Sequence, residues 1–362
     1  MLRTLRITNF RGLREFEMSG LGRINLLVGT NNCGKTTVLE AIDLLAGPGT
    51  ALPLWQAQMR RGELVERSAE RQMAVAHLIH EHRLEENRGF GVAGDDELGA
   101  IEVKAVVVSR APSAEPEGNE DDVSVADEAI APLSLILEWN TRSRRGAARL
   151  PITRWGGIRG STISASRAPE LKETTRRVSL VTTEGLTRDS IVSMFESIVL
   201  TPSEQTVVEA LRTIEPALER IASVGTQTRS SILDARGGLA MMVAGQRIPI
   251  GSMGDGIWRL LGIALALVHA RGGVLLVDEI DTGLHYSVLV DMWRLVLATA
   301  RSLDVQVFAT THSRDCYEAL AAVTEDDRHE ISLQRIERGK PHAIGFSEAE
   351  IRQAAERGLE VR

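Results

Sequence analysis

A glycine-bearing loop at residues 29–37, GTNNCGKTT, is the feature that most constrains the fold of this chain. It matches the pattern G-x-x-x-x-G-K-[ST] of a phosphate-binding loop. A continuous apolar run (INLLV, residues 24–28) precedes it, and residues 38–45 follow with helical spacing up to a Gly-Pro-Gly stop. A loop of this kind works only between a buried strand and a helix, so the motif predicts a strand–loop–helix unit of an α/β protein.

The chemistry of such a loop is phosphate binding. Its backbone N–H groups curl around a phosphate, and the start of the helix adds the positive end of its dipole. Lys35 would reach the β- and γ-phosphates, and the Thr36 hydroxyl would ligate Mg²⁺. We therefore predict ATP and Mg²⁺ as cofactors, with these residues binding the nucleotide: Gly29, Asn31, Asn32, Gly34, Lys35, Thr36 and Thr37.

Two further apolar runs end in polar residues that suit hydrolysis. Residues 273–277 (GVLLV) lead into Asp278 and Glu279, at the edge of a sheet where ligands bind in α/β folds. We predict that Asp278 holds the magnesium and that Glu279 polarises the attacking water. Residues 305–310 lead to His312, which we predict to be a catalytic residue that senses the γ-phosphate.

A glycine-rich segment, IGSMGDG at 250–256, precedes a predicted helix over 257–270. A small helix start that carries a serine can bind an anion, although the same residues can simply cap the helix. Both readings stay open at this point.

The two ends of the chain have α/β character and the middle does not continue it. We predict a nucleotide-binding core from residues 1–50 and 245–362, split by an inserted lid, helical and strand-rich region over 51–244. Within the insertion, residues 54–88 and 188–223 are predicted to be helical. Strands are predicted at 101–108, 133–139 and 178–182.

Composition excludes several classes of protein. Of 362 residues, 43% are hydrophobic and 25% charged, which is typical of a globular protein. No apolar run is long enough to span a membrane, and the first residues do not resemble a signal peptide. Two cysteines exclude a disulfide scaffold, so we expect a cytoplasmic protein without a membrane partner.

Charge is distributed unevenly. The segment 113–129 has seven acidic residues and no basic one, and we predict it to be a disordered loop that hydrolysis does not need. Residues 141–177 have ten basic and two acidic residues, here called the basic stretch. It is either a surface for DNA or an acidic partner, or a solvated face beside the acidic loop.

Two small constellations are interpreted as structural. His77, His80 and His82 lie close together, but their helical spacing and the lack of cysteines lead us to interpret them as part of a packed or solvated helix rather than as a metal site. Cys33 lies in the phosphate loop, where a small filler residue is the default interpretation and redox sensitivity the alternative.

Taken together, the chain resembles ABC-type ATPase heads of the SMC, RecF and OLD group. The resemblance rests on the loop 29–37, the opening ITNFRG (7–12), LLVDEIDTGLH (275–285), HLIHEH (77–82), TTHS (310–313) and GLEVR (358–362). It implies a mixed sheet core with an antiparallel β subdomain. It also implies a head-to-head dimer or higher homo-oligomer around two ATP molecules, in which Ser252 and Gly254 contact the partner's nucleotide. Arg11 would bind nucleotide too, and residues 281–285 would form the D-loop at the interface.

This chain departs from the pattern in two places. Its signature is SMGDG rather than LSGGQ, which leaves Asp255 without a role, and no Q-loop glutamine is identifiable among Gln56, Gln58 and Gln72.

OLD-like enzymes often carry a Toprim nuclease domain after the ATPase. Only 50 residues follow His312, so the resemblance implies a separate effector such as a Toprim-type nuclease. Similar stand-alone ATPases occur in bacterial phage defence, which is the function we predict. The alternative is a RecF-like repair ATPase that binds DNA through the basic stretch. A transporter subunit is disfavoured by the signature.

Overall fold

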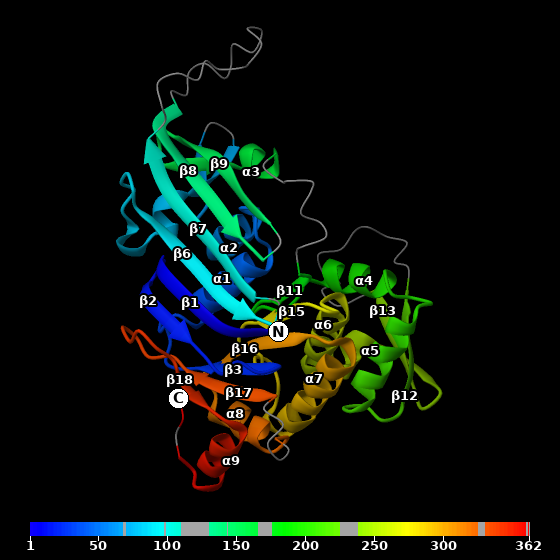
Figure 1. Cartoon of the computed structure of the whole chain (residues 1–362). Coiled ribbons are helices and arrows are strands. Elements are labelled where there is room, and N and C mark those ends of the chain that lie inside the picture. The colour runs from blue at the N-terminus through cyan, green and yellow to red at the C-terminus, as the bar shows by residue number, and fades with distance from the viewer. Residues whose placement is uncertain are drawn as a thin grey trace.

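The computed structural model describes residues 1–67, 70–97, 99–109, 130–142, 144–165, 176–224, 238–324, 330–359 and 361. The acidic segment 113–129 lies outside them. Two large sheets organise the described part, and helix α1 lies between them (Figure 1).

The first sheet is antiparallel, in the strand order β2-β1-β6-β7-β8-β9. Its strands are β1 (Leu2–Phe10), β2 (Leu13–Met18), β6 (Gly89–Asp96), β7 (Gly99–Ser109), β8 (Ile130–Asn140) and β9 (Arg145–Thr153). Apolar residues alternate along β1, so that Leu5 and Ile7 are buried while Arg6 is exposed. This period of two gives the sheet one buried face.

The second sheet has the order β11-β15-β16-β3-β17-β18, and only β18 runs antiparallel to its neighbour. Its strands are β3 (Ile24–Val28), β11 (Val178–Val181), β15 (Val274–Val277), β16 (Gln306–Thr311), β17 (Ile331–Arg335) and β18 (Ile344–Phe346). Strands β3, β15 and β16 are buried at every position, as expected for a parallel sheet covered on both faces.

Helices cover the two faces of this second sheet. Helix α1 (Lys35–Ala46) is buried almost all round and packs its apolar residues against both sheets. The other face carries α6 (Asp255–His269), α7 (Leu289–Leu303) and α8 (Arg314–Ala321), with α9 (Glu348–Glu356) at the edge. Contacts with both sheets bury α1 on opposite sides, including its charged residues Glu40 and Asp43, and place it at the centre of the described part.

Most of the remaining elements lie in the range 51–244 or just after it, and one 3₁₀ turn lies between β15 and α7. They are α2 (Leu52–Arg61), β4 (Val65–Arg67), β5 (Glu70–Ala74), β10 (Gly157–Arg159), α3 (Gly160–Ala165), α4 (Arg188–Glu196), α5 (Pro202–Arg212), β12 (Leu218–Ser223), β13 (Leu239–Val243) and β14 (Gln246–Pro249), with short 3₁₀ turns at Val75–Leu78, His80–His82, Ile250–Met253 and Tyr286–Val288. Strand β6 of this range pairs with β1, and β11 pairs with β15, so both join sheets of the flanking segments, while β7–β9 extend the first sheet outward from β6. The predicted division at residues 50 and 245 remains a prediction.

The α/β class with a mixed sheet and an antiparallel sheet is confirmed, and two local expectations are wrong. The α-helix within residues 54–88 ends at Arg61, because Gly62 takes a left-handed φ of 66°, and only the short 3₁₀ turns at 75–78 and 80–82 follow it. Leu218 and Ile221 lie on strand β12, not on a helix. A β-bulge between Leu218 and Arg220 gives the strand a burial period of three, which imitates helical spacing.

Candidate functional site

The loop 29–37 connects the end of β3 to the start of α1, as the sequence predicts. Gly29 has φ 147°, and a Cβ there would lie 2.3 Å from the carbonyl oxygen of Ile336, so only glycine fits. Gly34 is also left-handed, at φ 109°, and directly precedes the helix. The Lys35 Nζ donates to the carbonyl oxygens of Gly29 (2.7 Å) and Thr30 (3.1 Å), which holds the ammonium group inside the loop.

Asp278 lies beside the start of α1. Strands β15, β16 and β3 are neighbours and end at the same edge of the sheet. At that edge the Thr36 hydroxyl donates to Asp278 Oδ2 at 3.1 Å, and the Thr310 hydroxyl donates to Oδ1 at 2.6 Å. Hydroxyl and carboxylate oxygens are the donors that Mg²⁺ prefers, so the residues present fit a magnesium ion.

Glu279 follows on a turn with an unusual backbone. Its φ is 47°, in the left-handed region that a non-glycine residue seldom occupies. Its N–H donates to Thr310 Oγ1 at 2.8 Å, and its Oε1 lies 3.3 Å from His312 Nδ1. The Glu279 and His312 side chains are 28% and 54% exposed, so both can reach a ligand in solvent. Strained backbone of this kind is common at active sites.

The segment 281–285 extends this site. Thr311 Oγ1 donates to Asp281 Oδ1 at 2.7 Å, and Thr282 Oγ1 donates to Glu279 Oε2 at 3.3 Å. His285 packs against Tyr286, which is 66% exposed. The segment therefore connects the Asp278–Glu279 turn to exposed side chains.

Ser252 and Gly254 lie together just before α6, and both are exposed. Gly254 is the N-cap residue of the helix, with φ 86°, and it supplies no side-chain capping hydrogen bond. Among the described residues, no hydrogen bond joins either of them to the loop 29–37 of the same chain. Their predicted contact with a second copy's nucleotide stays a prediction.

Arg11 is buried in a cluster of charges that the sequence did not point to. Its Nε lies 2.7 Å from Glu40 Oε2, and its Nη1 donates to both oxygens of Glu63 at 2.8 and 3.0 Å. Arg61 Nε donates to the other oxygen of Glu40 at 2.7 Å. The predicted contact between Arg11 and nucleotide is not tested by these contacts, which show the guanidinium occupied by two carboxylates.

The same cluster perturbs a neighbouring acid on α1. Burial, reinforced by the nearby Glu40, raises the pKa of Asp43 from 3.8 to about 6, although Arg60 at 3.9 Å opposes the shift. Only the spacing of Glu40 and Asp43 on the helix could have suggested this cluster, because its arginines come from β1–β2 and α2.

Arg259 is a second buried arginine that sequence reasoning missed. It is 8% exposed and donates to main-chain carbonyl oxygens of Thr182, Asp278 and Glu279. Its position within a predicted helix gave no signal, because its partners are backbone atoms.

The residues interpreted as structural are in ordinary surroundings. His77 and His82 pack edge to face, and His80 Nδ1 lies 2.9 Å from the Arg11 carbonyl oxygen. Among the described residues, no three or more His, Cys, Asp or Glu side chains gather in a way that could hold a metal ion. Cys33 is buried beside Gly29. Gln58 pairs with the backbone of Ala74, and Gln72 accepts from Thr153, which ties both to structural contacts.

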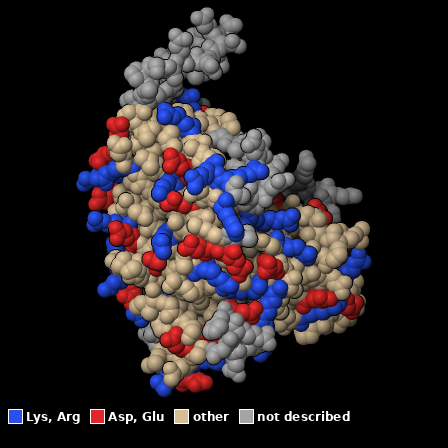
Figure 2. All heavy atoms as spheres, viewed as in Figure 1, with Lys and Arg blue, Asp and Glu red and all other residues tan. Residues whose placement is uncertain are grey.

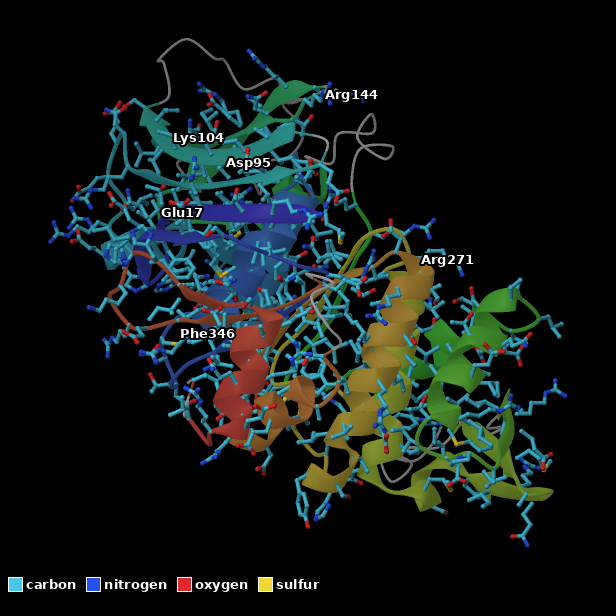
Figure 3. All side chains as sticks on the ribbon, turned by 60° about the horizontal axis from the view of Figure 1, so that its bottom comes forward. Glu17, Asp95, Lys104, Arg144, Arg271 and Phe346 are labelled. Atoms are coloured by element: carbon cyan, nitrogen blue, oxygen red, sulfur yellow. The ribbon has the colours of Figure 1, made fainter. Side chains whose placement is uncertain are left out.

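The described part of the basic stretch lies away from this edge. Arg142, Arg144 and Arg145 flank the turn between β8 and β9, and Figure 3 shows Arg144 and Lys104 on that sheet and Arg271 just after α6. A cavity of about 750 Å³ is lined by Arg142, Arg176, Arg177 and Arg271 together with Asp96 and Glu97. On the face in Figure 2, basic and acidic side chains alternate rather than gather by sign.

Every helix in the described part of the chain falls short of the length and apolar character needed to cross a membrane.

Comparison with known proteins decides the family. Residues 24–315 match the family described as "AAA domain, putative AbiEii toxin, Type IV TA system". The chain belongs to this AAA domain family. It is therefore a nucleotide-binding ATPase, and the predicted enzyme class is confirmed.

Individual relatives agree in part. An "ATP/GTP phosphatase" of Helicobacter pylori is 21% identical over 92% of this chain and 91% of its own length. The "OLD nuclease" of Thermus scotoductus is 47% identical over 13% of this chain and 9% of the nuclease. An uncharacterized protein of Methanocaldococcus jannaschii is 48% identical over 12% of this chain and 20% of that protein. The chain thus spans a small part of the last two relatives.

Among solved structures, the SMC head domain from Thermotoga maritima is similar with 13% identity and a TM-score of 0.47, over 96% of this chain and 98% of that one.

Proposed function

We propose that this ATPase binds ATP·Mg²⁺ between two copies of the chain and hydrolyses it at the Asp278–Glu279 turn. The observation that carries the proposal is the meeting of Thr36, Asp278, Glu279 and His312 at one sheet edge. A neutral hydroxyl contacts Asp278, so its charge remains available to a metal, while Glu279 stays accessible to water.

The loop residues bind the phosphates, with Lys35 turning from the carbonyls of Gly29 and Thr30 to the β- and γ-phosphates. The magnesium ion, held by Thr36 and Asp278, would neutralise charge that develops on the phosphates. Glu279 accepts a proton from the attacking water, and His312 beside it orients the carboxylate and senses the γ-phosphate. Ser252 and Gly254 complete the site of the second copy.

The experiment compares wild type with Glu279→Gln and Lys35→Ala by light scattering, with and without ATP·Mg²⁺. Glu279→Gln keeps the shape of the site but removes the base, so it should accumulate as an ATP-dependent dimer. Lys35→Ala should lose ATP binding by calorimetry and should not assemble, because the phosphates lose their charged partner. Assembly that ignores ATP in all three proteins would refute the sandwich.

We further propose that ATP turnover regulates a separate effector protein in anti-phage defence. The local likeness to an OLD nuclease supports a nuclease effector, and the family's description names a toxin. Co-expression with the products of adjacent genes tests this: a DNase activity that requires this chain and responds to Lys35→Ala supports it. Adjacent products that leave DNA intact with wild-type protein contradict a nuclease effector.

The alternative is direct DNA binding through the basic stretch, as in a repair ATPase. Reversing Arg142, Arg144 and Arg145 to glutamate changes the local charge by six units. If DNA is the partner, wild type should bind it with a steep salt dependence that the triple variant loses, while ATP binding survives. On the face in Figure 2, acidic side chains lie among the basic ones, which gives this alternative no support there.

A further inference from the structure

Arg259 stands between the proposed signature and the catalytic turn of the same chain. It lies on α6, one turn after Asp255, the first residue of the helix. The segment 251–254, in which Gly251, Ser252 and Gly254 are exposed, directly precedes that turn. Figure 1 shows α6 beside the strands β11 and β15, and β15 leads into Asp278.

The guanidinium of Arg259 contacts the backbone of both strand ends. Its Nη1 donates to the carbonyl oxygen of Thr182 at 2.8 Å, just after β11. Its Nη2 donates to the carbonyl oxygens of Asp278 at 3.2 Å and Glu279 at 3.1 Å, just after β15. The side chain therefore joins α6 to the two strand ends at the nucleotide edge.

Burying a guanidinium among carbonyl groups is costly. The Nε is buried and has no hydrogen-bond partner among the described residues. Burial lowers the pKa of Arg259, although the carboxylates of Asp281, Asp278 and Glu279 oppose the shift. A hydrophobic residue would fill the space at lower cost, so the guanidinium has to do something that packing alone does not.

Two of the Arg259 hydrogen bonds are made to the turn that carries Glu279. That residue is held at φ 47°, a conformation that persists only when its surroundings determine it. Thr310 contacts the turn through the Glu279 N–H, and the Thr310 carbonyl accepts from Ile280 at 3.0 Å. Arg259 holds the two carbonyl groups of the same turn, so Glu279 is clamped from both sides.

We propose that Arg259 is a positioning residue that couples the signature segment to Glu279, and through it one nucleotide site of the dimer to the other. The inference rests on the proposed function, in which Ser252 and Gly254 contact the partner's nucleotide. A contact made there moves the first turn of α6, and Arg259 carries that movement to the catalytic turn of its own subunit. Each subunit then hydrolyses ATP efficiently only when its signature is engaged.

The test compares Arg259→Gln and Arg259→Lys with the control Arg212→Gln in the full chain. Arg212 on α5 also donates to carbonyl oxygens, those of Leu218 at 2.7 Å and Glu219 at 3.3 Å, but on strand β12. For each protein the measurements are kcat, KM, the Hill coefficient for ATP, ATP affinity by calorimetry, and Tm.

Arg259→Gln should lower kcat by about tenfold to a hundredfold, the scale of misplacing a catalytic group by about 1 Å. ATP affinity should stay within about twofold, and a wild-type Hill coefficient above one should fall toward one. Arg259→Lys should recover only part of kcat, because one ammonium cannot reproduce the planar fork of donors. Arg212→Gln should lower Tm with little change in kcat.

An unchanged kcat and Hill coefficient in Arg259→Gln would overturn the inference, as would an equal loss of kcat in Arg212→Gln at a matched loss of Tm. If Arg259→Gln does not fold, the same comparison is made with Arg259→Lys. A wild type that dimerises with ATP while Arg259→Gln behaves normally removes the coupling alone. A wild type that never dimerises with ATP refutes the proposed sandwich, and the coupling with it.

Discussion

The first two turns of α1 lie beside carboxylates with different hydrogen-bond and ion-pair partners. On the first turn, Thr36 contacts Asp278, whose two side-chain oxygens accept, within the described part of the chain, from the neutral hydroxyls of Thr36 and Thr310. On the next turn, Glu40 lies between Arg11 and Arg61, and each of its oxygens is 2.7 Å from a guanidinium nitrogen. The Asp278 carboxylate contacts α1 through Thr36, and the Glu40 carboxylate is part of the same helix.

The negative charge of Asp278 is left available to a cation, whereas the negative charge of Glu40 is compensated by arginines. A neutral hydroxyl orients Asp278 without cancelling its charge, so a cation can still be attracted to it. The charge on Glu40 is already compensated by two arginines, and that arrangement ties α1 to α2 and to the β1–β2 turn. We therefore expect substitutions on the first turn to affect hydrolysis, and those on the second to affect stability.

We expect the largest effect from Asp278→Asn, which keeps the shape of the side chain and removes its charge. Hydrolysis should fall by about 10²-fold or more, because the site loses its charged metal ligand. Tm should change little, since both threonine hydroxyls can still bond to the amide. A steady-state assay across a range of Mg²⁺ concentrations measures the effect. Wild-type activity in this variant would show that Asp278 does not hold the metal.

We expect the next largest effect from Thr310→Val, which removes one of the neutral hydroxyl groups that contact Asp278. The hydroxyl of Thr310 contacts both Asp278 and the N–H of Glu279, and valine has nearly the same shape. We expect kcat to fall by about tenfold, since two catalytic carboxylates lose their orientation. ATP affinity by calorimetry should stay within about twofold. A loss of affinity instead would place Thr310 in nucleotide binding.

The residues that lie near the first turn of α1 are largely predictable from the sequence, but the charge cluster around Glu40 on the second turn is not. The loop 29–37, Asp278, Glu279 and His312 each follow a short apolar run, and parallel strands have to end at a common edge. The Arg11 cluster assembles residues from three elements whose packing no periodicity reveals. The same limit applies to Arg259, whose partners are carbonyl oxygens that every residue type carries.

Strands predicted at 101–108, 133–139 and 178–182 in the inserted range are confirmed, but two of its segments show why a local pattern can mislead. Leu218 and Ile221 have helical spacing because of a bulge, and the charged residues after Arg61 lie on short strands paired within a small sheet. In the parallel sheet, strands are buried on both faces and their apolar runs are unambiguous. The core is therefore easier to predict from one sequence than the range 51–244.

Glu40→Gln should have a moderate effect on stability and a small one on activity. Breaking a buried ion pair costs about 3–5 kcal/mol, but Arg61 is a third exposed and Arg11 keeps Glu63, so we expect about 1–3 kcal/mol. Tm should fall by several degrees. The hydrolysis rate of the folded protein at 25 °C should remain within about twofold. A hundredfold loss of hydrolysis at unchanged Tm would contradict the separation of the two turns.

Asp43→Asn should have the smallest effect, with the opposite sign. The pKa of Asp43 is about 6 in the folded state against 3.8, so the folded protein holds this proton more tightly than the unfolded chain. This carboxyl therefore lowers the free energy of unfolding as pH rises from about 4 to about 6, by at most about 3 kcal/mol. Asparagine cannot ionise, so the variant should melt a few degrees above wild type at pH 7.5 and with it at pH 4. Glu350→Gln is the control, because hydrogen bonds from Ser347 lower the pKa of Glu350 and its removal should not stabilise the protein at any pH. If Asp43→Asn instead melts below wild type at pH 7.5, the ion pair with Arg60 outweighs the cost of burying Asp43. The charges around Glu40 and Asp43 would then all stabilise the protein.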